Sequence, residues 1–221
     1  MRGEIFGIAL ALCCATTALG AADQEQWRIE RLDGVIIRTR NLSGGVTEFI
    51  AEGTLDASVQ DIEDVLTRVE LHPRFMPYVK ESRVVGRGTD GGRLVYVLLD
   101  FPFFFKSHDY VINVHVDQSS RRTNEFRSHW STETDVVPEK DDVVRVPLNE
   151  GEWVVTGEGP GRSHVLYRYA VNPGDKVPSW AEDFGRKDGV LKLFRRIQAE
   201  ASDRAFRRHY YGRDAAKSAR R

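Results

Sequence analysis

The sequence predicts an α+β domain in which a single curved antiparallel sheet is closed by one long C-terminal helix. Between residues 27 and 171, short runs of alternating apolar and polar residues are separated by turn signals, which favours antiparallel strands. The helical segments are grouped and do not alternate with the strands, so a βαβ arrangement is disfavoured. The 221 residues fit one domain of generous size.

Three strands and a helix are expected in the first part of the chain. Asp33-Gly34 is a strong hairpin signal, and it separates two alternating segments, 27–32 and 35–42. A third alternating segment follows the turn residues Ser43-Gly44-Gly45. Ser58 can then cap a helix over residues 59–69, whose apolar residues share one face.

The central part of the chain predicts a short helical turn near Pro73 and then mostly strands. The expected strands span residues 79–87, 93–101, 109–117, 124–131, 143–146, 152–157 and 163–171. Alternation also gives each strand two faces. In the strand 109–117, the apolar inner face carries Tyr110, Ile112, Val114 and Val116, whereas Val111 and Asn113 fall on a wetter outer face.

The closing helix is predicted over residues 178–208, where Pro178 suits the first turn. Its apolar stripe consists of Trp180, Phe184, Leu191, Phe194, Ile197, Ala201 and Ala205. Such a stripe must be covered, and the apolar face of the sheet is the available cover. Either a packed core or an apolar cavity can lie between the two surfaces, and periodicity alone does not decide which.

Composition narrows the functional classes. Hydrophobic residues at 41% and charged residues at 29% are typical of a soluble globular protein, so disorder and a polytopic membrane protein are disfavoured. The net charge of −1 does not favour a nucleic acid partner. Residues 209–221 form a basic tail that we expect to be disordered, and transient contact with anionic lipid head groups is the alternative.

The sequence offers no signal for a metal, a cofactor or a catalytic residue. The six histidines show no ligand spacing, and both cysteines lie within the first 22 residues. Ser107, His108 and Asp109 are triad residue types, but neighbours on an extended strand point in opposite directions and cannot form the relay. Strands rich in Val, Ile and Trp, with no inward carboxylate or histidine, also disfavour an enzyme.

The segment between the strands 93–101 and 109–117 is unusual because it carries Pro102 and three consecutive phenylalanines, Phe103, Phe104 and Phe105. An ordinary hairpin uses polar turn residues there. Exposed aromatic residues on a loop meet a partner, a membrane or a ligand. The alternative is that they fold over the sheet edge as core.

In this loop the chain resembles the StAR-related lipid transfer (START) domain in its bacterial secreted form. The family pattern is a Pro-aromatic loop followed by Arg-Asp-aromatic-Val, and Pro102–Val111 reproduces it except that His108 replaces the arginine. The resemblance continues through Glu52–Ser58, His72–Val85 and Glu150–Trp180. The order and the spacing of these segments match the family pattern over about residues 25 to 202.

The resemblance implies a helix-grip fold with a hydrophobic tunnel for one lipid-like molecule. The tunnel lining is expected from Ile112, Val114, Val116, Phe126, Trp130, Trp153, Tyr167 and Phe194. The tunnel mouth is expected from Phe103, Phe104, Phe105, Trp180, Phe184 and Leu191. Because histidine lacks the permanent bidentate charge of arginine, an ion pair of the family is not expected at His108.

The expected function is therefore binding and transfer of a lipid by a monomer, without catalysis. Two alternatives stay open: a polyketide aromatase or cyclase of the same superfamily, and a quinone-binding chaperone. The cyclase requires an acid/base pair inside the tunnel. The domain is expected over residues 23–208, between a signal peptide, 1–22, and the basic tail.

The signal peptide is expected because Arg2 precedes an apolar run that ends in small residues. The apolar run is shorter than the ~20 residues of a membrane-spanning helix, which favours cleavage over an anchor. The protein is then periplasmic or secreted.

We expect N-terminal sequencing of the exported protein to begin between Ala21 and Asp23. A membrane-bound product that still carries Met1 would contradict the cleavage.

Overall fold

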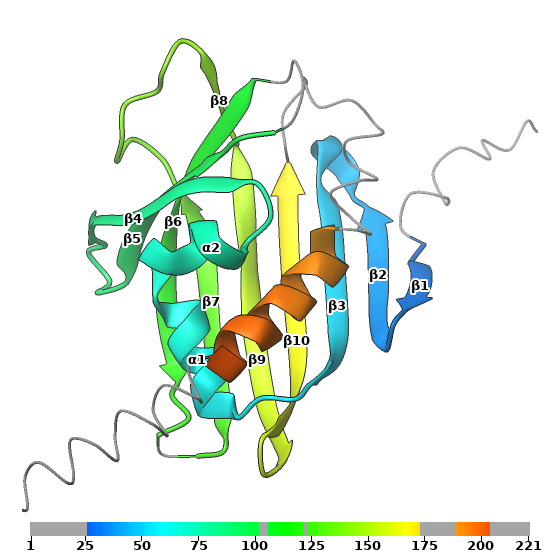
Figure 1. Cartoon of the computed structure of the whole chain (residues 1–221). Helices are drawn as coiled ribbons and strands as arrows, with labels where there is room; N and C mark the ends of the chain where they lie inside the picture. The colour runs from blue at the N-terminus through cyan, green and yellow to red at the C-terminus, as the bar shows by residue number, and fades with distance from the viewer. Residues whose placement is uncertain (1–25, 102–105, 122, 173–188, 204–221) are drawn as a thin grey trace, which may run out of the picture.

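The computed structural model describes residues 26–101, 106–121, 123–172 and 189–203, and its fold is an open, curved antiparallel sheet covered on one face by helices (Figure 1). The sheet has ten strands in the order β1-β2-β3-β10-β9-β7-β6-β5-β4, with β8 paired in parallel to β6. The strands are β1 (Arg28–Leu32), β2 (Val35–Asn41), β3 (Thr47–Leu55), β4 (Val79–Arg87), β5 (Arg93–Leu99), β6 (Ser107–Gln118), β7 (Glu125–Glu133), β8 (Val143–Arg145), β9 (Leu148–Gly159) and β10 (Arg162–Asn172).

The predicted α+β class and the helix-grip arrangement are confirmed. The opening hairpin turns through Asp33 and Gly34, both with positive φ, as a tight two-residue turn requires. The first three strands are neighbours in the sheet, and β10 then pairs with β3, which joins the end of the chain to its beginning. The sheet does not close, because β1 and β4 remain edge strands.

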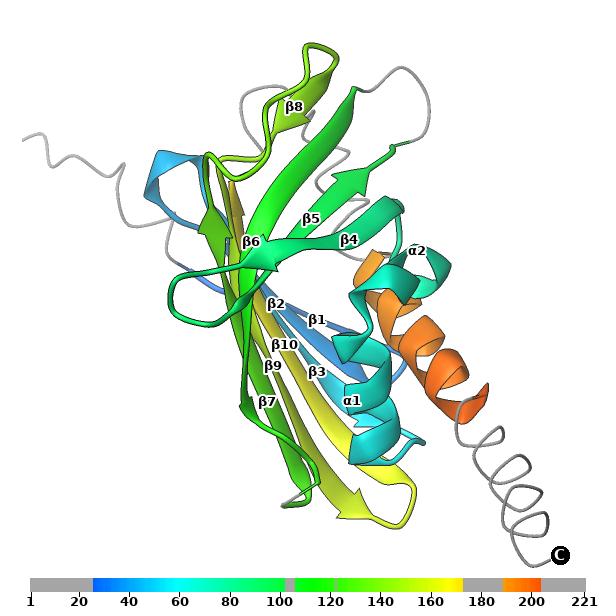
Figure 2. The ribbon, with the colours of Figure 1, turned by 90° about the vertical axis from the view of Figure 1, so that its left-hand side faces the viewer.

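The helices lie together on one face of the sheet (Figure 2). They comprise α1 (Val59–Thr67), α2 (His72–Phe75) and the C-terminal helix, described over residues 189–203, with short 3-10 turns at η1 (Ser43–Gly45) and η2 (Val69–Leu71). Ser58 caps α1 by accepting a hydrogen bond from the Asp61 backbone N–H at 3.2 Å. Helix α1 ends at Thr67, whose carbonyl accepts a hydrogen bond from Arg93.

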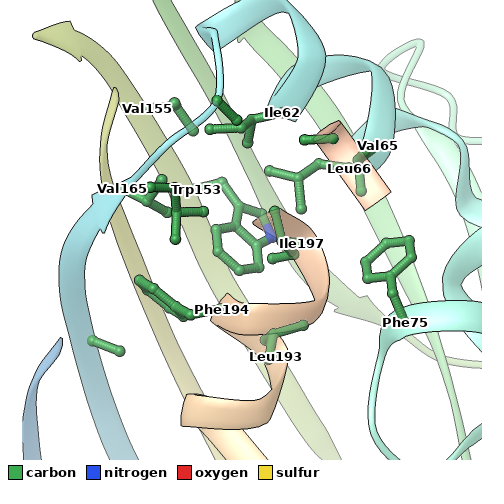
Figure 3. Packing of buried hydrophobic residues seen from close by; sticks show 14 of the residues in the cluster. Ile62, Val65, Leu66, Phe75, Trp153, Val155, Val165, Leu193, Phe194 and Ile197 are labelled. Carbon is green, nitrogen blue, oxygen red and sulfur yellow. The ribbon is translucent and has the colours of Figure 1, made fainter. Parts of the chain in front are cut away.

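The main core lies between the C-terminal helix, α1 and the inner face of the sheet (Figure 3). Its members come from three sources: Ile62, Val65 and Leu66 on α1; Trp153, Val155 and Val165 on β9 and β10; Val190, Leu193, Phe194 and Ile197 on the C-terminal helix. Fully burying a side chain of this size contributes about 1.5–3 kcal/mol. Of the predicted apolar stripe of the closing helix, Phe194, Ile197 and Ala201 are therefore buried in the core and Leu191 packs against it, whereas Trp180, Phe184 and Ala205 lie outside the described residues.

The outer face of β6 is less exposed than the alternation predicts. Val111 is buried beside Tyr96, its register partner on β5, and Asn113 is buried beneath Asp90. The Nδ2 of Asn113 donates to the Asp90 carboxylate at 2.9 Å, which satisfies the donor side of the buried amide, whereas its Oδ1 has no partner within the described structure. In the part of the chain that the structure describes, no helix is both long and apolar enough to cross a membrane.

Replacing Phe194 by Ala should lower the free energy of unfolding by about 3–5 kcal/mol, since the ring is fully buried between helix and sheet. The exposed Arg196 on the same helix provides the matched control, and Arg196→Ala should change stability by less than about 0.5 kcal/mol. Denaturant midpoints of the two variants test this. Equal midpoints would show that the helix does not stabilise the sheet.

Candidate functional site

A row of stacked aromatic side chains crosses the inner face of the sheet, and we call it the aromatic wall. It consists of Phe49 on β3, Tyr167 and Tyr169 on β10, Trp153 on β9 and Trp130 on β7. Tyr167 is central: its ring centroid lies 4.0 Å from that of Trp153 and 5.1 Å from that of Tyr169. The Phe49 ring continues the stack, 4.7 Å from Tyr169.

Sheet register explains how distant parts of the sequence form this wall. Tyr167 pairs with Trp153, and Tyr169 pairs with Phe49, so their side chains leave the sheet side by side on the same face. Gly151 stands opposite both Trp130 and Tyr169. A Cβ at Gly151 would lie 2.6 Å from Cζ2 of Trp130, so the missing side chain makes room for the indole.

Polar groups accompany the wall. The indole Nε1 of Trp130 donates to Oδ1 of Asn149 at 2.9 Å, and the Asn149 side chain also forms a hydrogen bond with the Tyr110 hydroxyl. Burial raises the pKa of Tyr110 and of Tyr167 well above the ordinary value for a phenol. The Tyr167 hydroxyl forms no hydrogen bond with the described part of the chain.

The residues predicted to line a tunnel mostly lie on this inner face. Phe126, Trp130, Trp153 and Phe194 are buried in the main core, and Ile112, Val114 and Tyr167 are half-buried against it. Val116 does not belong to this interior, because its exposed fraction is 44%. A register shift follows it on β6, where the strand runs toward the hairpin with β7. Alternation predicts on which face of the sheet Val116 lies, but it does not predict where along the strand the covering helices end.

Most of the predicted tunnel mouth lies outside the described residues. This applies to Phe103, Phe104, Phe105, Trp180 and Phe184, as it does to the signal peptide 1–22 and the basic tail 209–221. Leu191 is described; it is half-buried and packs against the main core. The mouth therefore stays a prediction.

The expectation that no histidine faces inward is wrong. His108 lies on β6 two residues before Tyr110, hence on the same inner face, and only 4% of it is exposed. Its Nδ1 lies 2.9 Å from the Lys106 carbonyl oxygen, and its ring packs edge-on against Phe101 at 5.3 Å. Extending the alternation of the strand backwards from Tyr110 would have placed it correctly.

Charged groups near His108 lie on the other face of β6. The buried Asp109 carboxylate accepts hydrogen bonds from Arg145 at 2.7 Å and from the Tyr96 hydroxyl at 3.1 Å. Among the described residues, no group of three or more His, Cys, Asp or Glu side chains is placed to hold a metal ion. The described inner face thus presents aromatic rings, aliphatic side chains and a few uncharged polar groups.

Comparison with known proteins assigns the family. Residues 55–193 match the family described as polyketide cyclase / dehydrase and lipid transport. The chain is a member of this START-domain family. The match begins at the last residue of β3 and spans α1, the strands β4 to β10 and the start of the C-terminal helix. It therefore includes the aromatic wall except Phe49.

Individual relatives agree with this assignment. The chain is 26% identical to an uncharacterized protein of Pseudomonas aeruginosa, over 92% of this chain and 100% of that protein. It is also 26% identical to the phosphatidylcholine transfer protein of Rattus norvegicus, over 80% of this chain and 84% of that protein. The crystal structure of a STAR-related lipid transfer protein from Xanthomonas axonopodis superimposes with a TM-score of 0.68 at 21% identity, over 80% of this chain and 98% of the other.

Replacing Gly151 by Ala should destabilise the START domain by about 1–3 kcal/mol and displace the Trp130 indole, because the added Cβ would also collide with the Arg168 carbonyl oxygen. Gly86 on β4 is the matched control, since its nearest contact would be an ordinary 3.6 Å to Leu94. Thermal denaturation and near-UV circular dichroism measure both effects. A Gly151→Ala protein with unchanged stability and aromatic spectrum would contradict the packing.

Proposed function

We propose that this START domain binds one hydrophobic lipid-like molecule between the aromatic wall and the C-terminal helix, and transfers it between membranes without chemical change. The observation that carries the proposal is the environment of Tyr110 and Tyr167. Burial raises the pKa of both phenols, yet both side chains keep accessible surface. Both half-buried tyrosines lie on the face that the helices cover, where a bound lipid would complete their cover.

The surface around these tyrosines suits an apolar ligand. Tyr167 lies between Trp153 and Tyr169 in the aromatic wall, and the half-buried Ile112 and Val114 lie on neighbouring β6. Contact with such a surface stabilises a lipid by about 25 cal/mol per Å² of apolar area removed from water. The relatives named as lipid transfer proteins support the same function.

Catalysis by a cyclase is less well supported than binding. An acid/base mechanism needs a positioned proton donor and acceptor on the ligand side of the sheet. His108 is the inward histidine of β6, but its described hydrogen bond goes to a backbone carbonyl and not to a carboxylate. A quinone carrier would use the same interior, so the identity of the bound molecule decides between a quinone and a lipid.

Transfer requires an entrance, and we propose that it is formed by Phe103, Phe104 and Phe105 together with Trp180, Phe184 and Leu191. Only Leu191 of this set is described, and it borders the main core at the start of the described C-terminal helix. The proposal for the other five follows from the resemblance of Pro102–Val111 to the Pro-aromatic loop of the family.

Native mass spectrometry of protein purified from its own host, followed by lipid extraction, should reveal one bound hydrophobic molecule per chain. Recovery of a chemically converted product from an added lipid would favour the enzyme. A protein that carries no ligand and takes up none from vesicles would contradict lipid binding.

Replacing Val114 by Trp should reduce uptake of a fluorescent lipid by at least about tenfold, because the larger side chain enters the interior space. Val154 on β9 provides the control, since it lies on the outer face beside Trp153 and Val155 of the core. Val154→Trp should bind the lipid like the unchanged protein. If both variants bind equally well, the ligand does not occupy this interior.

A further inference from the structure

His108 carries a buried hydrogen-bonding atom that has no partner among the described residues. Nε2 of this histidine is inaccessible and makes no hydrogen bond within the described structure. Most buried polar atoms in proteins are paired, because an unpaired one loses its water without compensation. An exception on the inner face of a lipid-binding sheet points to a group that the ligand completes.

The other nitrogen fixes which kind of partner is needed. Nδ1 lies 2.9 Å from the carbonyl oxygen of Lys106, and a carbonyl oxygen only accepts hydrogen bonds. Nδ1 therefore carries the proton and donates it. In a neutral imidazole Nε2 then carries a lone pair and no proton, so it can only accept a hydrogen bond.

The surroundings keep this imidazole neutral. Burial is the largest influence and lowers the pKa of His108, while the bond to Lys106 and the charge of Asp109 oppose it less strongly. Asp109 is the adjacent residue, but its side chain lies on the opposite face of β6, where Arg145 and Tyr96 hold it. No described carboxylate or cation pairs with the imidazole ring.

His108 also has the position expected of a contact for the polar end of a lipid. It lies two residues from Tyr110, whose hydroxyl lies near Asn149 beside the aromatic wall. Phe101 packs edge-on against the imidazole and is itself only half-buried. Apolar chains fit the wall further along the sheet.

We propose that Nε2 of His108 accepts a hydrogen bond from a hydroxyl group at the polar end of the bound lipid, an inference that rests on the proposed lipid-binding function. The ligand is then a lipid that carries a hydroxyl group at its polar end. Phosphatidylcholine does not meet this requirement, because an ionised phosphate, a quaternary ammonium and two esters contain no hydrogen-bond donor. The chain would thus differ in ligand from the phosphatidylcholine transfer proteins that it resembles.

Three fluorescent lipids with identical acyl chains test the donor requirement: a diacylglycerol, its O-methyl ether and a phosphatidylcholine. The unchanged protein should bind the diacylglycerol at least about tenfold more tightly than the ether, because the ether leaves Nε2 unpaired. Phosphatidylcholine should bind no better than the ether. Equal affinity for diacylglycerol and its ether would overturn the inference while leaving lipid binding intact.

Variants assign the preference to His108. His108→Leu should bind both lipids within about twofold of each other, whereas His108→Gln, whose amide oxygen can replace the acceptor, should keep most of the preference. His164→Leu is the matched control, because His164 lies beside buried Val165 on the outer face of β10. A His108→Leu protein that is folded and still prefers the diacylglycerol tenfold would overturn the proposal.

The protonation of His108 can also be measured in the unchanged protein, so the test does not depend on a variant that folds. The ¹⁵N spectrum of the imidazoles in the ligand-free protein should show His108 with its proton on Nδ1, and the Nε2 signal should shift when diacylglycerol binds. A proton found on Nε2 would overturn the inference even if lipid uptake is normal. If none of the three lipids binds, the proposed function fails, and this inference with it.

Discussion

The fold depends on one burial event, the contact between the apolar stripe of the C-terminal helix and the inner face of the sheet. A helix with such a stripe is unstable in water until another surface covers it. Phe194 and Ile197 meet Trp153 and Val165 there, and these two partners come from neighbouring strands of the sheet. The same contact encloses the inner face, so a domain that folds in this way also isolates an apolar surface from water.

The inner face has two parts, since one part is core and the other would face the proposed ligand. At the α1 end, Val155 and Val165 are fully buried against Ile62, and no surface remains for another molecule. Along the aromatic wall, Tyr167 on β10 is covered incompletely, as are Ile112 and Val114 on β6, beyond β9 and β7. The residues that stabilise the fold are therefore separated from those proposed to bind a ligand.

Much of this architecture could be predicted from sequence, because strands, turns and helix stripes are written in local patterns. Asp33-Gly34 gave the hairpin and alternation gave the facing of Tyr110 and Tyr167. Local patterns could not show that the helices stop covering the inner face of β6 before Val116. They also could not show that Asp90 and Tyr96 bury part of the outer face of β6. Both features depend on tertiary packing, which local patterns do not contain. The inward direction of His108 was missed for another reason: the residue was compared with a family motif and was not assigned to a face of its strand.

Adjacent residues of one strand couple the outside of this domain to its interior. Arg145, which follows a loop after β7, holds Asp109 on the outer face, and the next residue back is His108 on the inner face. A β-strand is a single backbone thick, so the two side chains share one stretch of main chain. A change in the loop that carries Arg145 would then reach the inner face through this shared main chain, without entering the interior.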